Sequence, residues 1–480
     1  MNKKIVFKMI GRILQIEGIL MLIPTAVGLI YGESSALWLI ISAVISFLIG
    51  SVPALLFRKC DKIVFAREGF AIVALSWILM SVVGALPFFL SGEIPNYISA
   101  FFETVSGFTT TGASILTDIT ALSKCMLFWR SFTHWVGGMG VLVFIMAVFP
   151  SESGRNVHIM RAEMPGPIVG KIVPKVRDTA KYLYIIYLAI SVLQVLLLWA
   201  GDMPLYDSLI HTFGTAGTGG FGIKPDSIAG YSPYSQWVIT VFMLLFGINF
   251  NLYFLIIIGR AKSAFKSGEL WCYLGIVAAS VVMVTINISS MYQSFAQTVR
   301  NAFFQVVSII TTTGFSTVDF NNWPEFSKMI LITLMFIGGC AGSTAGGLKI
   351  SRIILMFKTV KRDFRRLIHP RSVNTVRFEG KPIDNETVSS LGGYLIIYMI
   401  LFFVILLFLS FEGLDFITNF TAMAACFNNV GPGLNLVGPL SNFACYSSAS
   451  KVLLSIAMLL GRLEIFPLLL ALSPSTWMKK

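Results

Sequence analysis

The chain has 480 residues, of which 56% are hydrophobic and only 12% carry a charge. Soluble globular domains carry about 25% charged residues, so this composition excludes an ordinary soluble protein and indicates an integral membrane protein. The formal net charge of +13 does not indicate nucleic-acid binding, because the Lys and Arg residues lie mostly between the apolar runs, where membrane topology accounts for them.

The apolar runs are long enough to cross a bilayer as helices, which takes about 20 residues each. They are aliphatic throughout and do not alternate with polar residues, so they predict spanning helices and not a barrel. The charge-free runs cover residues 36–57, 69–92, 131–151, 182–201, 227–259, 270–299, 329–348 and 388–411. The six cysteines show no paired spacing, so neither a disulfide framework nor a zinc site is indicated.

At the N-terminus, two apolar stretches at residues 13–31 and 36–57 predict a helical hairpin. Basic residues stand at both of its outer ends, so the positive-inside rule places these ends in the cytoplasm. No small-residue cleavage site follows a short hydrophobic core, and we therefore expect the first helix to be retained.

After this hairpin a short segment recurs four times. Residues 308–315 are Ser-Ile-Ile-Thr-Thr-Thr-Gly-Phe and residues 106–113 are Ser-Gly-Phe-Thr-Thr-Thr-Gly-Ala, while looser copies end at Gly220 and Gly431. Each copy is too short to cross a membrane. The recurrence predicts four related units, each with a spanning helix, a half-buried segment that ends in a glycine, an outer loop and a second spanning helix.

We therefore predict an all-α membrane protein with five parts. These are an N-terminal hairpin at residues 1–67 and four helix, pore-helix, helix repeats at residues 68–181, 182–268, 269–390 and 391–480. Basic loops follow the repeats, with the largest at residues 155–181 and 358–381, and all of them fall on one side if the chain makes ten crossings. This arrangement predicts that both termini are cytoplasmic.

Non-helical backbone at membrane depth is tolerated only where protein buries it or where it lines a water-filled cavity. Four re-entrant segments therefore predict a central pathway. The alternative is that the Ser, Thr and Gly residues serve close packing between helices, which is common in membranes. The same position of the segment within each of four units favours the pathway.

The glycines themselves suit a cation pathway. The copy Val430, Gly431, Pro432, Gly433 resembles the Thr-Val-Gly-Tyr-Gly filter of potassium channels, where backbone carbonyls replace the hydration shell of the ion. Glycine can adopt the positive φ that turns successive carbonyls toward one axis. Half-helices leading into the segment could also point their negative C-terminal ends at a cation.

Because of these segments, its length and its extra hairpin, the chain resembles the Trk/Ktr/HKT superfamily of cation transporters, and most of all the membrane subunits of bacterial Trk potassium uptake. The resemblance implies four non-identical units around a pseudo-fourfold pore, a homodimer and a place in the bacterial inner membrane. Members with serine at the first filter position tend to carry sodium, so Gly112 implies potassium. The implied K⁺ filter comprises Thr110, Thr111, Gly112, Gly219, Gly220, Phe221, Thr312, Thr313, Gly314, Asn429, Val430 and Gly431.

Two further features suggest a gate. A glycine-rich run interrupts the second helix of the third repeat, and glycine costs about 1 kcal/mol relative to alanine at each helical position. The resemblance implies an intramembrane loop here, just below the filter, although close helix packing is the alternative. The second feature is Arg462, which matches a pore arginine of the family or else holds a loop carbonyl or carboxylate in place. The implied gate comprises Gly338, Gly339, Gly342, Gly346, Gly347 and Arg462.

Other polar residues within the spans are less informative. Glu464 stands two residues from Arg462 and is expected on a different helix face, so the two are not expected to pair. Arg130 is predicted to be a structural or interfacial anchor. Glu103 could attract cations or cap a neighbouring unit, and both roles stay open. His134 and His211 are expected to make local hydrogen bonds.

The leading hypothesis is a potassium-conducting subunit that is not an enzyme and carries K⁺ as the transported ion with no organic cofactor of its own. No dinucleotide or P-loop fingerprint is present, so nucleotide sensing would belong to a cytosolic TrkA-type regulator of the NAD or ATP class, as the resemblance implies. The basic loops could dock this regulator, although a lipid-facing surface would have the same composition. The alternative is a proton- or sodium-coupled symporter, for which a buried carboxylate relay would be expected.

Overall fold

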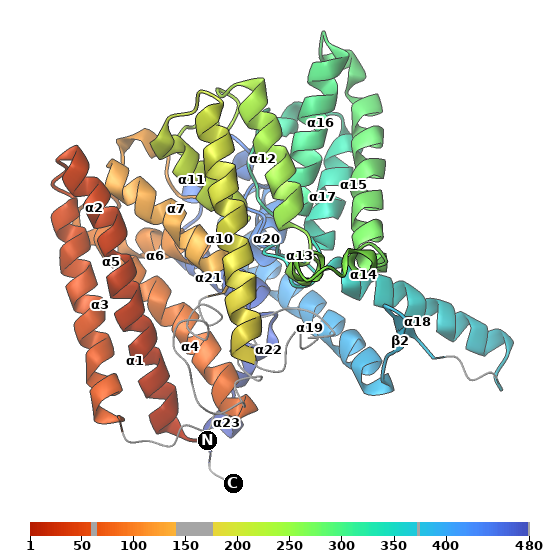
Figure 1. Ribbon diagram of the computed structural model, residues 1–480, viewed down its shortest axis with the longest axis horizontal. Helices are drawn as coiled ribbons and strands as arrows, with labels where there is room; N and C mark the ends of the chain where they lie inside the picture. Colours follow the sequence, from red (N-terminus) through yellow and green to blue (C-terminus); the bar gives the residue numbers. More distant parts are fainter. Residues whose placement is uncertain (59–64, 141–175, 372–374, 479–480) are drawn as a thin grey trace.

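The computed structural model describes residues 1–58, 65–140, 176–371 and 375–478 (Figure 1). It confirms the predicted all-α class, because helices form nearly all of the regular structure in these residues. The one strand pair of the described residues is a short antiparallel hairpin of β1 (Arg377–Phe378) and β2 (Lys381–Pro382). Most of the predicted basic loop at residues 155–181, from 155 to 175, lies outside the described residues, as do Lys479 and Lys480.

The N-terminal hairpin forms as predicted. Helix α1 (Lys3–Leu20) continues into α2 (Leu22–Tyr31), which ends at Gly32 with a φ of 70°, and α3 (Ala36–Leu56) returns beside them. Small residues allow the close approach, since a Cβ built on Gly11 or Gly50 would lie less than 3.0 Å from the backbone of the other helix. The hairpin packs against the first repeat at one side of the molecule (Figure 1).

The remaining helices follow the predicted order of spanning helix, short helix and second spanning helix four times. The first group is α4 (Ala66–Gly84), α5 (Leu86–Leu90), α6 (Tyr97–Phe108) and α7 (Lys124–Gly138), and the second is α10 (Val176–Ala200), α11 (Leu205–Ala216), α12 (Pro233–Phe246), α13 (Phe250–Ile257) and α14 (Ala261–Ala264). The third is α15 (Gly268–Asn287), α16 (Phe295–Ile310), α17 (Glu325–Ile337) and α18 (Ile350–Ile368), and the fourth is α19 (Asn385–Leu409), α20 (Phe416–Phe427), α21 (Ser448–Arg462), α22 (Phe466–Leu472) and α23 (Pro474–Trp477). Short 3-10 turns lie at Ile119–Ala121, Ser289–Met291, Phe320–Asn322, Ser410–Glu412, Asn435–Val437 and Phe443–Cys445. The exact repeat boundaries stay a prediction.

Six helices of the described residues are long and apolar enough to cross a membrane, or up to eight if each of two bent pairs is one span. The bends are 89° between α12 and α13 and 118° between α21 and α22. Of the other predicted crossings, the one at residues 131–151 lies partly in α7 and partly outside the described residues, and one is divided into α17 and α18 by a loop. The chain is therefore a multi-pass membrane protein.

The short helices α6, α11, α16 and α20 lie inside the bundle. They have 12, 12, 16 and 12 residues, and most side chains on each are buried. Twelve helical residues rise about 18 Å, well short of the roughly 30 Å of the hydrocarbon core. Each short helix therefore ends inside the protein, and each ends just before one of the four recurring glycines.

Candidate ion pathway

The four glycine segments, residues 110–112, 218–220, 312–314 and 429–431, share one unusual backbone pattern. The glycine that closes each segment has a positive φ, of 81° at Gly112, 77° at Gly220, 80° at Gly314 and 100° at Gly431. The residue two places earlier also has a positive φ, of 54° at Thr110, 53° at Thr218, 55° at Thr312 and 56° at Asn429. The residue between these two does not have a positive φ.

This alternation has a chemical consequence. In an ordinary strand successive carbonyls point to opposite sides. When every second residue has a left-handed backbone conformation, successive carbonyls can point to the same side. The conformation is unfavourable for threonine, because a β-branched side chain at positive φ is an outlier. Strained backbone of this kind costs about 1–3 kcal/mol per residue and persists only where the surroundings impose it. Its presence in all four segments indicates a shared function.

The segments meet in a closed ring. A Cβ built on Gly112 would lie less than 3.0 Å from the carbonyl oxygen of Gly219, and one on Gly220 would meet Thr313 in the same way. A Cβ on Gly314 would likewise meet the carbonyl oxygen of Val430, and one on Gly431 would meet that of Thr111, which closes the ring. Each glycine thus packs against the backbone of the next segment in chain order, and any side chain there would push the ring apart.

Threonine hydroxyls brace the segments from behind. The Oγ1 atoms of Thr109 and Thr111 lie 2.7 Å apart, and those of Thr311 and Thr313 lie 2.8 Å apart. Asn429 Nδ2 donates to Thr111 Oγ1 over 2.9 Å, which links the fourth segment to the first. These hydroxyls are bonded to protein and hold neighbouring parts of the ring together.

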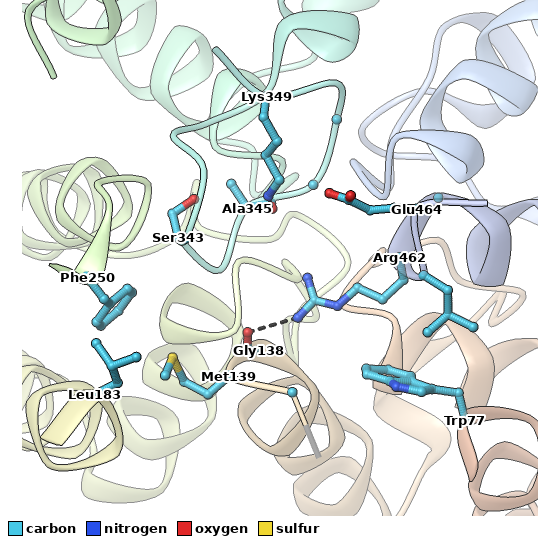
Figure 2. Close-up of a pocket in the computed structure, with 16 residues that line it drawn as sticks. Trp77, Gly138, Met139, Leu183, Phe250, Ser343, Ala345, Lys349, Arg462 and Glu464 are labelled. Carbon is cyan, nitrogen blue, oxygen red and sulfur yellow. Dashed lines mark hydrogen bonds between the residues drawn. The ribbon is translucent and has the colours of Figure 1, made fainter. Parts of the chain in front are cut away.

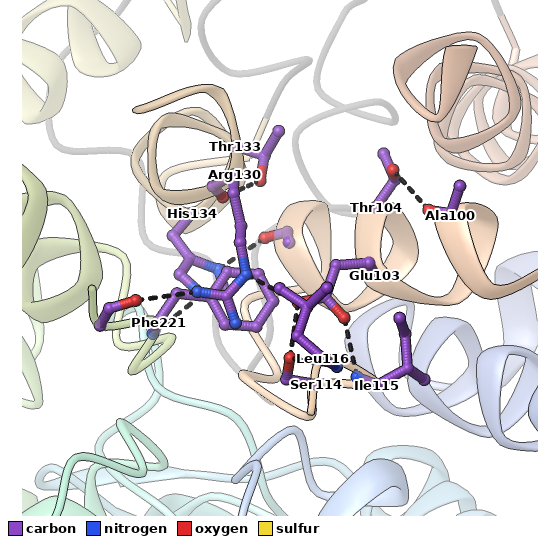
Figure 3. Close-up of polar contacts among 12 residues, drawn as sticks. Ala100, Glu103, Thr104, Ser114, Ile115, Leu116, Arg130, Thr133, His134 and Phe221 are labelled. Carbon is purple, nitrogen blue, oxygen red and sulfur yellow. Dashed lines mark hydrogen bonds and ion pairs between the residues drawn. The ribbon is translucent and has the colours of Figure 1, made fainter. Parts of the chain in front are cut away.

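A buried ion pair supports the first segment from its outer side (Figure 3). Arg130 and Glu103 are 2% and 1% exposed, and Arg130 Nε lies 2.7 Å from Glu103 Oε1. Glu103 also accepts hydrogen bonds from Ser114 Oγ and from the backbone N–H of Ile115. Glu103 therefore ties together its own repeat and does not cap a neighbouring unit.

The same arginine reaches the second repeat. Arg130 donates to the carbonyl of Gly222 over 3.0 Å, and its guanidinium lies 3.5 Å from the centre of the Phe221 ring (Figure 3). The predicted structural role of Arg130 is therefore confirmed, whereas the interfacial alternative is wrong because the side chain is buried. Phe221, which the sequence placed in the filter, turns its ring behind the segment.

Both histidines make local hydrogen bonds, as predicted. His134 Nδ1 lies 2.7 Å from the carbonyl oxygen of Gly107 and must donate to it, so Nε2 is free to accept the N–H of Phe221 at 3.3 Å. The imidazole thereby joins the first repeat to the second. His211 Nε2 lies 3.1 Å from the hydroxyl of Tyr231, which donates to Asp207.

Two pockets lie on opposite sides of the ring. The lining of the outer one includes the four glycines Gly112, Gly220, Gly314 and Gly431. The inner one is lined by Gly138, Trp77, Arg462, Glu464 and residues of the glycine loop, which we define as residues 338–349 (Figure 2). The glycine segments separate the two.

The glycine loop interrupts the helix where the sequence predicted a break. Helix α17 ends at Ile337 and α18 begins at Ile350, and between them Gly338, Gly342 and Gly347 have φ values of 72°, 72° and 76°. Gly339 accepts a hydrogen bond from the backbone of Ile350. The close-packing alternative is wrong for this run, because its backbone is not helical.

The loop touches the ring directly. The N–H of Gly346 donates to Thr312 Oγ1 over 2.6 Å, and the N–H of Gly347 donates to the carbonyl of Asn428 over 3.1 Å. A Cβ on Gly346 would collide with that same carbonyl. On its other side the loop is held by Glu269, which accepts the N–H of Ala341 at 2.7 Å. The loop thus lies against the inner side of the third and fourth segments.

Arg462 joins this loop to the first repeat across the inner pocket (Figure 2). It donates to the carbonyls of Thr344 at 2.9 Å, Gly137 at 2.5 Å and Gly138 at 2.8 Å. Glu464 pairs with Arg352, so the expectation that Arg462 and Glu464 do not pair with each other is confirmed. The reason given for it is wrong, because Glu464 lies in the bend between α21 and α22, with a φ of 55°, and not on a helix face. The two interpretations of Arg462 are compatible, since it lines the pocket and also holds a loop carbonyl.

Two residues of the site escaped the sequence analysis. Thr218 occupies the strained position of the second segment, and the constant offset of two residues before each glycine could have identified it. Lys349 is 3% exposed, lines the inner pocket and donates from Nζ to the carbonyl of Ala345. No signal in the sequence distinguishes it from the basic residues that follow.

Comparison with known proteins agrees with this architecture. The model of the TrkH family, described as cation transport protein, matches residues 38–270 and 267–479. The Trk system potassium uptake protein TrkH of Salmonella typhimurium is 36% identical over 485 residues, which cover 99% of this chain and 100% of that protein. TrkG of Escherichia coli, also a Trk system potassium uptake protein, is 33% identical and covers 99% of this chain and 98% of its own.

The fold is also shared with a solved structure. The crystal structure of the potassium transporter TrkH from Vibrio parahaemolyticus superposes with a TM-score of 0.89 at 32% sequence identity, and the match covers 100% of both chains. These relatives are transporters, which agrees with the prediction that the chain is not an enzyme. The chain therefore belongs to the TrkH family of cation transport proteins.

Proposed function

We propose that the chain takes up potassium across the bacterial inner membrane through the ring of glycine segments. The observation that carries the proposal is the alternating backbone of the four segments, a pattern that can turn successive carbonyl oxygens toward one side. A ring of carbonyls can replace the hydration shell of K⁺. In this proposal the carbonyls of residues 110–112, 218–220, 312–314 and 429–431 hold the ion, and no organic cofactor is needed.

The proposed gate lies between the ring and the inner pocket. The glycine loop lies against Thr312 and Asn428, and Arg462 holds it to the end of α7. A positive guanidinium below a cation pathway also opposes the passage of K⁺. Conduction therefore requires that the loop move away and that Arg462 release at least one of its carbonyl partners.

The names of the relatives indicate a multi-component uptake system. We propose that this chain forms a homodimer with cytoplasmic termini, and that a cytosolic TrkA-type regulator binds nucleotide and acts on the glycine loop from the inner side. The regulator supplies the nucleotide chemistry, and the membrane chain supplies the ion pathway and the gate.

The test is rubidium uptake into vesicles that contain the purified chain, with sodium as competitor. Gly314→Ser places a side chain where a Cβ would meet Val430, so we expect loss of rubidium uptake or a rise in sodium permeability. Gly275→Ser is the matched control, because a Cβ on Gly275 meets nothing within 4 Å. Unchanged uptake and selectivity in folded Gly314→Ser protein would refute the filter.

The same vesicles separate a channel from a coupled symporter. A channel needs only the rubidium gradient, whereas a symporter needs a proton or sodium gradient to accumulate the ion. Uptake that persists when both of these gradients are abolished supports the channel. Uptake that stops without one of them would favour the symporter and identify its coupling ion.

A further inference from the structure

The outer pocket has an unusual lining for the entrance of a cation pathway. Arg130 and Lys224 are among the residues that line it, whereas none of its lining residues in the described part of the chain is Asp or Glu. Cation channels commonly place rings of carboxylates along the path, because negative charge attracts the ion. The positive charge at this entrance therefore calls for a physical explanation.

The charge of Arg130 is compensated, and that of Lys224 is not. Arg130 Nε lies 2.7 Å from Glu103 Oε1, and both side chains are buried (Figure 3). Lys224 takes part in none of the ion pairs among the described residues. Its Nζ lies over the ring of Tyr231, 4.0 Å from the ring centre. A cation–π contact of this kind holds the ammonium in place and leaves its charge intact.

Two carboxylates belong to the same region, but neither lines the pocket. Asp207 accepts the hydrogen bond of the Tyr231 hydroxyl over 2.8 Å, and Asp226 follows Lys224 by two residues in the chain. They weaken the field of the ammonium from outside the lining. A neutral residue in place of Lys224 would leave both carboxylates unopposed, so the potential at the entrance would become more negative.

Lys224 is close enough to the ring to act on an ion there. It follows Gly220, which closes the second segment, by four residues, and four residues span at most about 14 Å. The Debye length at physiological ionic strength is about 8 Å, so salt screens the charge only in part over such a distance. A cleft with low-dielectric walls also concentrates the field of the charges that line it.

A fixed positive charge discriminates between cations by their valence. Two unit charges about 10 Å apart in water repel each other enough to lower the local concentration of the mobile one about twofold. The repulsion doubles for a divalent ion, so its local concentration falls about fourfold. Backbone carbonyls are also ligands for Ca²⁺, so a carbonyl ring is open to block by divalent ions unless they are kept away.

We propose that Lys224 is a specificity-determining residue that excludes divalent cations from the outer mouth of the pathway. The inference rests on the proposed function, because it assigns a role at the entrance of the ring. The ring selects ions whose hydration shell its oxygens replace, and Lys224 adds selection by charge.

The test is inward potassium current through the purified chain in planar bilayers, with Mg²⁺ on the outer side and potassium far below saturation. At an ionic strength of about 0.01 M, we expect Lys224→Gln to raise the conductance about twofold. The Mg²⁺ concentration that halves the current should fall about fourfold. An impermeant salt at about 1 M shortens the Debye length to roughly 3 Å and should abolish both differences. A change in packing alone would not respond to salt in this way.

Two further variants separate charge from structure. Lys224→Arg keeps the charge and should resemble the natural protein. Lys124→Gln is the matched control, because Lys124 Nζ also lies over a tyrosine ring, 3.8 Å from the centre of Tyr31, but Lys124 does not line the outer pocket. It should leave conductance and Mg²⁺ block unchanged. The ratio of potassium to sodium permeability should stay the same in every variant, because one charge acts equally on both ions.

Equal Mg²⁺ block in Lys224→Gln and the natural protein would overturn the inference. The same change in Lys124→Gln or in Lys224→Arg, or an altered ratio of potassium to sodium permeability in Lys224→Gln, would also overturn it. A natural protein that carries no potassium current would refute the proposed function and this inference with it. Potassium current with unaltered block would refute the role of Lys224 alone.

Discussion

Removing the guanidinium of Arg462 should favour the open state of the pathway. In the structure this group holds Thr344 of the glycine loop over 2.9 Å and, at the same time, the carbonyls of Gly137 and Gly138. Arg462→Ala removes the link between loop and first repeat. Arg462 and Gly138 line the inner pocket, where water can replace the lost donor, so the fold is expected to survive.

The expected change in the ratio of open to closed molecules follows from the single hydrogen bond between Arg462 and the glycine loop. A hydrogen bond to a charged group contributes about 1.5–3 kcal/mol net. If only the closed state makes the bond to Thr344, its loss raises the ratio of open to closed molecules about 10- to 150-fold, since 1.4 kcal/mol is tenfold. The other contacts of the loop, such as that of Gly346 with Thr312, remain and limit the effect.

Single-channel recording of the purified chain without any regulator measures this ratio. Arg462→Lys separates two causes, because lysine keeps the charge but lacks the planar fork that reaches several carbonyls. If tethering closes the pore, Arg462→Lys should lie between the natural protein and Arg462→Ala, and if charge alone matters it should resemble the natural protein. Arg260→Ala, in an exposed inner loop, is the control. Unchanged open probability and conductance in Arg462→Ala would refute the gate.

Two further predictions concern the support of the ring. Glu103→Gln leaves Arg130 buried with a neutral partner, and breaking a buried pair costs about 3–5 kcal/mol. Thermal unfolding in detergent should therefore show a clearly lower midpoint temperature. Glu325→Gln removes the charge of an exposed carboxylate and should leave the midpoint unchanged. An equal midpoint for both would contradict the role of the pair. At the strained position of the second segment, Thr218→Asn should keep rubidium uptake, because Asn tolerates positive φ and occupies this position in the fourth segment. Thr218→Val should lose uptake. Equal uptake by the two variants would show that the strain is unimportant.

Much of this architecture could be predicted because it depends on local pattern. Two Thr-Thr-Gly copies and two looser ones identified the four segments. The run from Gly338 to Gly347 predicted a break in the helix, since glycines in such number destabilise a helix wherever it lies. Basic loops and apolar runs indicated the spans for the same local reason. The comparisons confirmed the resemblance to which these patterns led.

The contacts between distant parts of the chain could not be predicted. Nothing near Arg462 in the sequence indicates that it meets Gly137, and nothing near Glu103 indicates Arg130 as its partner rather than a cation. The left-handed backbone of Thr110, Thr218 and Thr312 runs against the preference of threonine, so propensity alone would exclude it. Lys349 stands shortly before a run of basic residues, yet it is buried and donates to the carbonyl of Ala345 in the loop that precedes it.

The closed ring is built from four stretches of a single polypeptide. In a tetramer of identical chains, one substitution changes all four quadrants of the pore at once. Here each quadrant of the ring is encoded separately, and the quadrants are not all alike, with Thr, Gly, Thr and Val before the final glycine. Natural variation can therefore alter the ring in single steps, one quadrant at a time, while the remaining three preserve its geometry.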